Sequence, residues 1–171
     1  FRADGNSSIG LGHIKRSEVL ALELAAAGHS VAFLTTQDTF VTDYLGQKGF
    51  LVHTLPQWGD RREMFALTAE AVNKIRPAIV FLDVINTDLE AVESMRRAGV
   101  KVASIDDLGP GGAAVDALIG VDIGILDGLL PQSSRERAEG RIFAGADYAI
   151  IAPEFVRLRD TVTPEKFGSR K

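Results

Sequence analysis

Residues 1–16, FRADGNSSIGLGHIKR, predict a strand, a glycine-rich loop and the start of a helix in immediate succession. Residues 1–3 are expected to be the end of a first strand whose beginning is missing, since the sequence has no initiator Met. A loop over residues 5–12 should lead into a helix over residues 13–27. Glycines in such a loop allow positive φ and a close approach of the backbone to a ligand. Because a helix start also offers free N–H groups and partial positive charge, the stretch predicts a site for a phosphate, a carboxylate or a developing negative charge.

Short apolar runs and helical segments alternate along the rest of the chain. Strands without polar alternation, separated by helices of about ten to fifteen residues, indicate a parallel sheet covered on both faces. The expected fold class is therefore α/β, a doubly wound Rossmann-like sheet, with residues 1–160 as one domain and 161–171 as a linker or tail. The other expected strands are 31–34, 50–52, 79–82 and 100–105, with weaker candidates at 117–119, 123–126 and 148–151; the helices are 38–48, 61–75, 87–98 and 153–160, and 109–112 is a loop.

Composition removes several classes of function. The net charge is 19 − 23 = −4 and no basic block is present, so nucleic acid is a poor candidate partner. The absence of cysteine excludes a disulfide framework, a thiolate nucleophile and cysteine-based metal sites. No apolar run reaches the roughly 18 residues of a membrane span. We expect a cytoplasmic protein without a membrane span, a metal or another cofactor.

Polar side chains follow the expected strand ends. In a doubly wound sheet, ligands bind outside the carboxyl ends of the strands, so these side chains should gather at one edge. The glycine loop itself is not a dinucleotide fingerprint, because Lys15 stands where the third glycine belongs, and no Gly-Lys-Ser/Thr follows as in a P-loop. The polar residues at this edge are Asp4, Asn6, Ser7, His13, Thr35, Thr36, Asp83, Asp106 and Asp107.

His13 is the candidate general base. It falls in the first turn of a helix, where the dipole disfavours imidazolium, and a neutral imidazole accepts a proton from water or a hydroxyl. The alternative is a residue that only caps or packs. His29 and His53 are interpreted as structural or solvated.

Three further side chains have a functional and a structural interpretation. Asp106 and Asp107 would bind a sugar hydroxyl or hold their loop in place. A metal site is not expected there, because no third acid stands at ligand spacing. Asp83, at a strand end, is a functional candidate. Arg16 would hold a phosphate or pair with surface carboxylates.

The opening residues resemble the PseG/SpsG-like family, which comprises UDP-sugar hydrolases of pseudaminic acid biosynthesis and spore-coat polysaccharide proteins. The family opening is Phe-Arg-x-Asp, followed by Ile-Gly-x-Gly-His-x-x-Arg, and residues 1–16 match it closely. Residues 105–108, Ile-Asp-Asp-Leu, match a second motif. A third is matched by Gly-Ala-Asp-Tyr-Ala-Ile at 145–150 with Pro-Glu-Phe at 153–155. In order and spacing, the resemblance covers nearly the whole chain.

The resemblance implies the N-terminal half of a GT-B-like fold, in which two Rossmann-like domains enclose the substrate. It also implies hydrolysis of a UDP-linked diacetamido-trideoxy-hexose by water, with inversion and with His13 as general base. A C-terminal nucleotide-binding domain would be the partner, and a UDP-sugar the ligand. The substrate-binding residues in this interpretation are Asp4, Asn6, Gly10, Leu11, Gly12, Arg16, Asp83, Asp106 and Asp107.

The chain also departs from the family pattern at three places. Val84-Ile85 replaces the family's x-Tyr after Asp83, Ile151-Ala152 replaces Leu-Arg, and residues 120–122 lack the expected Asp-x-Asn. Two alternatives therefore stay open beside hydrolysis. One is a GT-B-type glycosyltransferase that uses a sugar acceptor in place of water, and the other is a non-catalytic sugar-nucleotide-binding module.

Overall fold

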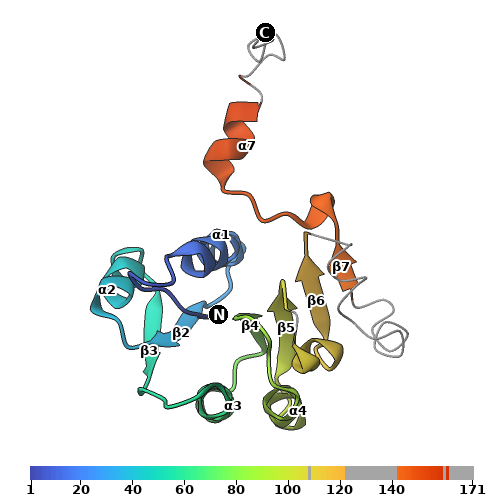
Figure 1. Cartoon of the computed structure of the whole chain (residues 1–171). Coiled ribbons are helices and arrows are strands. Elements are labelled where there is room, and N and C mark those ends of the chain that lie inside the picture. Colours follow the sequence, from blue (N-terminus) through green and yellow to red (C-terminus); the bar gives the residue numbers. More distant parts are fainter. Residues whose placement is uncertain (108, 122–141, 160, 162–171) are drawn as a thin grey trace, which may run out of the picture.

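Seven strands form one parallel sheet in the computed structural model, which describes residues 1–107, 109–121, 142–159 and 161 (Figure 1). Every neighbouring pair of strands is parallel, and the order is β3-β2-β1-β4-β5-β6-β7. The strands are β1 (Arg2–Ala3), β2 (Ala32–Thr36), β3 (Leu51–Leu55), β4 (Ile79–Asp83), β5 (Lys101–Ile105), β6 (Ala117–Gly120) and β7 (Ile142–Ala144).

Helices cover both faces of this sheet, which confirms the predicted α/β doubly wound class. Helices α1 and α2 lie on one face and α3 and α4 on the other, and α7 stands apart from the sheet (Figure 1). Three of these helices have an aspartate as N-cap. The carboxylates of Asp38, Asp60 and Asp88 each accept a hydrogen bond from a backbone N–H of the first turn. The helices are α1 (Gly12–Ala26), α2 (Thr39–Gln47), α3 (Arg61–Ile75), α4 (Leu89–Arg97) and α7 (Pro153–Arg159), with 3₁₀ turns η1 (Pro110–Ala113) and η2 (Ala146–Tyr148).

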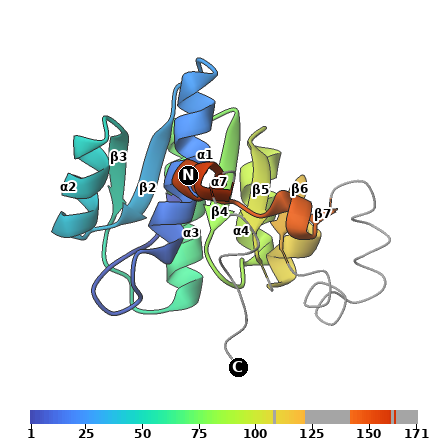
Figure 2. The ribbon, with the colours of Figure 1, turned by 90° about the horizontal axis from the view of Figure 1, so that it is seen from above.

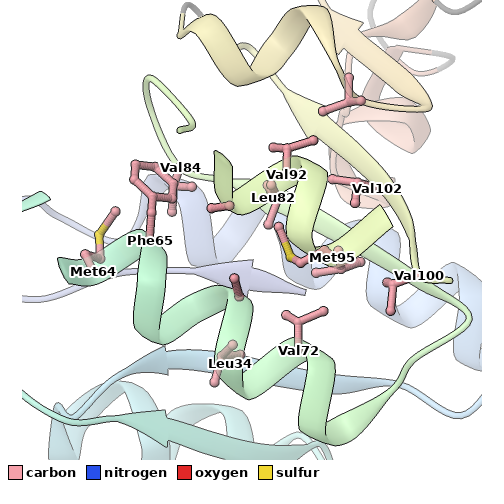
Figure 3. Packing of buried hydrophobic residues seen from close by; sticks show 14 of the residues in the cluster. Leu34, Met64, Phe65, Val72, Leu82, Val84, Val92, Met95, Val100 and Val102 are labelled. Atoms are coloured by element: carbon pink, nitrogen blue, oxygen red, sulfur yellow. The ribbon is translucent and has the colours of Figure 1, made fainter. Parts of the chain in front are cut away.

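Two hydrophobic clusters hold these layers together, one on each face. The larger joins the sheet to α3 and α4, and Figure 3 shows Phe65 and Val72 of α3 facing Val92 and Met95 of α4 across the β4 residue Leu82. The smaller joins the sheet to α1 and α2. Full burial of each Val, Leu, Ile, Phe or Met side chain in these clusters contributes about 1.5–3 kcal/mol. Members of the smaller cluster include Ala3, Ile14, Ala21, Phe33, Val41, Leu45 and Phe50.

The carboxyl-terminal part differs from the prediction in three places. Residues 148–151 are not a strand, because Tyr148 and Ala149 donate backbone hydrogen bonds to Gly145 and Ala146 and so close turns. The seventh strand, β7, was not predicted, since three residues are too few for a pattern. The predicted loop at 109–112 contains a 3₁₀ turn that begins at Pro110. The strand candidate at 123–126 and residues 162–171 of the expected tail lie outside the described residues.

The order of the strands reverses at β1. The chain leaves β1 through α1 toward β2 and then β3, and it returns through α3 to β4 on the other side of β1. The view from above shows α1 over this central part of the sheet (Figure 2). A crevice outside the carboxyl ends of the strands at such a reversal is the usual ligand site of open α/β sheets. No helix in the described part of the chain is long and apolar enough to cross a bilayer.

Gly109 lies against the backbone of the loop after β4, and its replacement by alanine should destabilise the fold. An added Cβ would lie 2.3 Å from the carbonyl carbon of Asn86 and 2.4 Å from the amide nitrogen of Thr87. Because both atoms belong to the backbone, we expect Gly109→Ala to lower the free energy of unfolding by about 3 kcal/mol, measured by urea denaturation.

Gly46→Ala is the matched control, because Gly46 lies in α2 and an added Cβ meets nothing within 4 Å. It should raise stability by about 1 kcal/mol through helix propensity. Equal effects of the two substitutions would contradict the close approach at Gly109.

Candidate functional site

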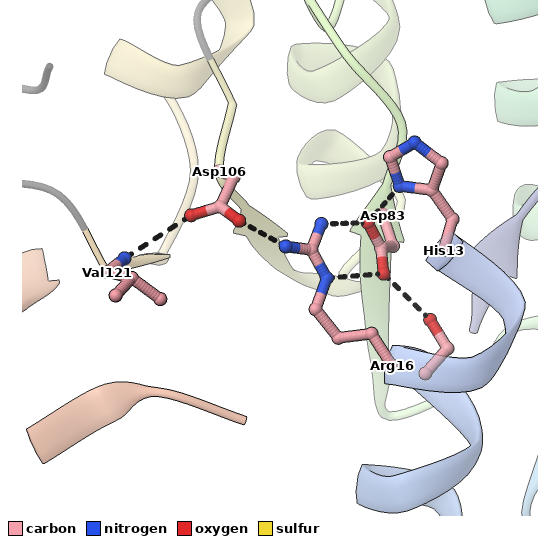
Figure 4. Close-up of polar contacts among 6 residues, drawn as sticks. His13, Arg16, Asp83, Asp106 and Val121 are labelled. Carbon is pink, nitrogen blue, oxygen red and sulfur yellow. Dashed lines mark hydrogen bonds and ion pairs between the residues drawn. The ribbon is translucent and has the colours of Figure 1, made fainter. Parts of the chain in front are cut away.

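His13 and Asp83 form a hydrogen-bonded pair at the reversal of strand order. Asp83 is the last residue of β4 and is fully buried, whereas His13 lies in the first turn of α1 with 30% of its side chain exposed. His13 Nδ1 lies 2.7 Å from Asp83 Oδ1 (Figure 4). In the tautomer with a proton on Nδ1, the ring donates to this carboxylate and Nε2 has a free lone pair. The pair therefore has the geometry of a histidine base oriented by an aspartate.

Arg16 holds Asp83 from the next turn of the same helix. Its Nε donates to Asp83 Oδ2 at 3.0 Å and its Nη2 to Oδ1 at 2.5 Å, a two-bond contact between guanidinium and carboxylate. Ser17 Oγ donates to Oδ2 at 3.2 Å. The third nitrogen of Arg16, Nη1, pairs with Asp106 (Figure 4). Arg16 therefore links the carboxylates that end β4 and β5.

Burial and neighbouring charge shift the pKa of Asp83 in opposite directions. Burial alone would raise its pKa, but the hydrogen bonds from His13 and Arg16 and the charge of Arg16 outweigh burial and leave the pKa below its ordinary value. The carboxylate is thus ionised at neutral pH, which is the form that orients and stabilises a protonated imidazole.

The low pKa of Asp83 predicts a loss of stability in acid. A carboxyl group whose pKa is lower in the folded than in the unfolded state contributes stability above the unfolded value, here 3.8, and loses it as pH falls through the folded value. Asp4 has a lowered pKa as well, because the hydrogen bond and charge of Arg2 outweigh its burial. We expect the free energy of unfolding in urea to fall steadily below about pH 4. A free energy that stays constant down to pH 2 would contradict this arrangement of charges.

Asp106 is held in a left-handed backbone conformation, with φ of 49°. Its Oδ1 accepts a hydrogen bond from the backbone N–H of Val121 at 3.3 Å, and 39% of its side chain is exposed. Residues with side chains adopt such φ values at a cost of order 1 kcal/mol, and the conformation tends to occur at functional positions. Asp106 is therefore the carboxylate of the cluster that a ligand reaches most easily.

Asp107 faces inward instead. It is fully buried, and its Oδ1 accepts hydrogen bonds from the amide N–H groups of Thr87 and Gly109, both at 2.9 Å. The hydroxyl of Thr87 donates to Oδ2. Asp107 thus ties together the loops that follow β4 and β5.

Asp4 and Asn6 also have internal partners. Asp4 Oδ1 accepts from the Thr36 N–H at 2.9 Å and lies 2.6 Å from Nη1 of the buried Arg2. Asn6 Oδ1 accepts from the N–H groups of Ser8 and Ile9, at 2.8 and 2.9 Å, and so shapes the glycine loop.

The glycine loop ends at the start of α1. Gly10 forms an antiparallel bridge with Asn6 and has φ of 76°. Glycine adopts this left-handed conformation without the steric cost that a side chain brings. Leu11 precedes the helix and provides no side-chain cap. An added Cβ at Gly10 or Gly12 would meet nothing within 4 Å, so the surface of the loop is open.

The structure thus brings four of the predicted site residues into one contact network: His13, Arg16, Asp83 and Asp106. Ser17 and the Val121 amide belong to the same network and were not identified from the sequence. One sequence signal could have found Ser17, because it stands at helical spacing between the apolar Ile14 and Ala21, on the face of α1 that is buried. Among the residues that the structure describes, no group of three or more His, Asp or Glu side chains is arranged to hold a metal ion.

Comparisons with known proteins give structural neighbours only. No family model matches the chain, and no curated protein matches by sequence. The chain is similar to the crystal structure of MurG from Acinetobacter baumannii, with TM-score 0.55 and 12% identity over 76% of this chain and 42% of that one. It is also similar to a glycosyltransferase from Rickettsia africae, with TM-score 0.55 and 15% identity over 95% of this chain and 49% of that one.

These similarities concern the fold, because both identities are low. The chain has the Rossmann-like fold of one half of a GT-B protein, and its matched part covers less than half of either neighbour.

Proposed function

We propose that this chain is the N-terminal half of a GT-B-type glycosyltransferase, in which His13 is the general base that activates a sugar hydroxyl. The observation that carries the proposal is the His13–Asp83 hydrogen bond at the strand reversal of a glycosyltransferase-like sheet. The partner is a second Rossmann-like domain that binds the nucleotide. The ligand class is a nucleotide sugar, with UDP-sugars favoured by the sequence resemblance.

The reaction places one proton on His13. The acceptor oxygen attacks the anomeric carbon while the bond from that carbon to the diphosphate oxygen breaks, and the bonding electrons leave with the nucleoside diphosphate. His13 Nε2 takes the acceptor's hydroxyl proton, and the Asp83 carboxylate stabilises the resulting imidazolium. Arg16 keeps Asp83 ionised and in place.

The other predicted substrate-binding residues take two kinds of role in this proposal. Asp106 accepts a hydrogen bond from a sugar hydroxyl through its exposed carboxylate, and Gly10, Leu11 and Gly12 offer the uncapped start of α1 to the negative charge that develops on the diphosphate. Asp4, Asn6 and Asp107 act through the loops that they hold.

Hydrolysis is the second candidate, and the close match of residues 1–16 to the PseG/SpsG-like opening favours it. The same base would then activate water, and the product would be a free sugar. Incubating the complete protein with a UDP-sugar, with and without added sugar acceptors, separates the two. A glycoside formed only with acceptor supports transfer, whereas free sugar formed at the same rate in both mixtures supports hydrolysis.

Binding to the chain itself tests whether the sugar of a nucleotide sugar lies next to His13, which both candidates require. In an NMR titration with UDP-GlcNAc, the ring signals of His13 should shift, and UDP alone should shift them less because it lacks the sugar. His29 lies outside the site and serves as the internal control. Equal shifts with UDP and UDP-GlcNAc, or no shift at His13, would contradict a catalytic role for this site.

A further inference from the structure

A buried arginine lies on the face of the sheet opposite His13. Arg2 belongs to the central strand β1, and its fully buried side chain points toward α3, where its Nε donates to the hydroxyl of Thr68 at 3.1 Å. Helix α1, which carries His13, covers the other face (Figure 1). The contacts of Arg2 therefore form a second polar cluster, separate from the network around Asp83.

One nitrogen of Arg2 is a buried donor without a partner. Nη1 lies 2.6 Å from Asp4 Oδ1, whereas Nη2 donates to no acceptor among the residues that the structure describes. Burial of an unpaired N–H group costs free energy, because the group has given up its hydrogen bonds to water. The free nitrogen therefore indicates a ligand group with an oxygen acceptor.

Asp4 adds a free acceptor beside this donor. Its Oδ1 receives the contacts from Arg2 and from the amide and hydroxyl of Thr36, and Oδ2 has no partner among the described residues. The side chain is 13% exposed, so Oδ2 is open to a ligand. Because the charges of Arg2 and Asp4 cancel, the pair suits a neutral group that both accepts and donates hydrogen bonds.

The ring of Trp58 lies beside the guanidinium. Its centroid is 5.8 Å from Cζ of Arg2, and the side chain is partly buried against the larger hydrophobic cluster. In the loop between β3 and α3, residues 56–58 form no backbone hydrogen bond with a described residue, and the Gly59 N–H donates to the Glu63 carboxylate at 2.6 Å. Side-chain packing holds Trp58 in place, so the ring can move without breaking a backbone hydrogen bond.

The cluster lies at the edge of the sheet where ligands of this fold class bind. Asp4 follows β1, Thr36 ends β2, and Trp58 follows β3, so all three stand at carboxyl ends of strands. A sugar matches the chemistry of the cluster. Its hydroxyl groups accept from a guanidinium and donate to a carboxylate, and its C–H groups pack on an indole ring.

We propose that Arg2, Asp4 and Trp58 form a carbohydrate-binding site, in which neighbouring hydroxyl groups of a neutral sugar bind Arg2 Nη2 and Asp4 Oδ2 while the Trp58 ring moves off the guanidinium to stack on the sugar. The site lies across the sheet from His13 and contains none of the groups of the reaction proposed above. It therefore stands or falls independently of that reaction.

Trp58 is the only tryptophan of the chain, so tryptophan fluorescence reports on this site. We expect the methyl glycoside of glucose, galactose or mannose to change the emission in a saturable way. Tetrahydropyran, a ring without hydroxyl groups, and inorganic phosphate should cause no such change at the same concentrations. The proposal is overturned if none of the three glycosides gives a saturable change, if tetrahydropyran gives the same change, or if the parent chain responds to phosphate instead.

Asp4→Asn tests the charge pair. The amide removes the negative partner of Arg2 and the carboxylate acceptor, so the affinity for the sugar should fall by about tenfold or more and a response to phosphate should appear. Arg2→Lys keeps the charge but removes the free guanidinium nitrogen, and it should weaken sugar binding similarly. Arg62→Lys makes the same change in a side chain that is 86% exposed and should have no effect.

Circular dichroism identifies the variants that fold, and each of the two site variants tests the proposal without the other. Parent-like sugar binding in a folded Asp4→Asn or Arg2→Lys chain would refute it. His13→Ala should bind the sugar as the parent chain does, because His13 lies on the other face of the sheet. Loss of the fluorescence response in His13→Ala would place the sugar at the His13 site and would also refute the separate site.

Discussion

Replacing His13 with alanine should lower kcat of the complete protein by about 10²–10⁴-fold, with little effect on folding. The reason is chemical, because the substitution removes the imidazole of the cluster at the strand reversal and with it the group that we propose as acceptor of the nucleophile's proton. Arg16 and Ser17 still hold Asp83 in the variant, so the melting temperature should change by only a few degrees. The measurement is the initial rate of UDP release from a UDP-sugar at saturating substrate.

Lys74→Ala is a suitable control for this rate. Lys74 is exposed in the last turn of α3, whose end precedes the start of β4 and so lies toward the opposite edge of the sheet from Asp83. Its removal should leave kcat unchanged. Full activity in His13→Ala would refute the general-base role, both for transfer to a sugar and for hydrolysis.

The edge of the sheet at which the site lies was predictable from the sequence. Asp83 and Asp106 follow apolar runs, and a parallel sheet places the carboxyl ends of its strands at one edge. His13 and Arg16 are three residues apart in a helix, so they share a face of α1. These two local rules brought four residues to the same place without any knowledge of their contacts.

The partners of these residues were not predictable, because they depend on packing across long stretches of chain. Asp83 is 70 residues from His13, and sequence alone left Arg16 free to pair with surface carboxylates instead. The left-handed conformation of Asp106 depends on how β5 meets its following loop. Asp107 faces inward and Asp106 is partly exposed, and no local sequence pattern distinguishes the two neighbouring aspartates.

Replacing Asp83 with asparagine should be the more damaging change, because it affects stability and activity together. The amide keeps one oxygen but places an N–H₂ group against the donors of His13, Arg16 or Ser17. Arg16 then loses one of its two carboxylate partners, the fully buried one, which costs on the order of 3–5 kcal/mol in the free energy of unfolding. Activity should fall by about 10³–10⁴-fold, as expected when the group that orients a histidine base is lost.

Ser17→Ala separates these two effects. It removes a single neutral hydrogen bond to Asp83 and leaves both His13 and Arg16 in contact with the carboxylate, so it should cost about 1 kcal/mol and leave most of the activity. If Asp83→Asn lost stability in urea but kept the rate of UDP release in native conditions, Asp83 would be a structural anchor for Arg16 alone. The expected result is that Asp83→Asn loses both stability and the rate of UDP release, while Ser17→Ala keeps both close to the values of the parent chain. That result would link the His13–Asp83 hydrogen bond to the chemistry.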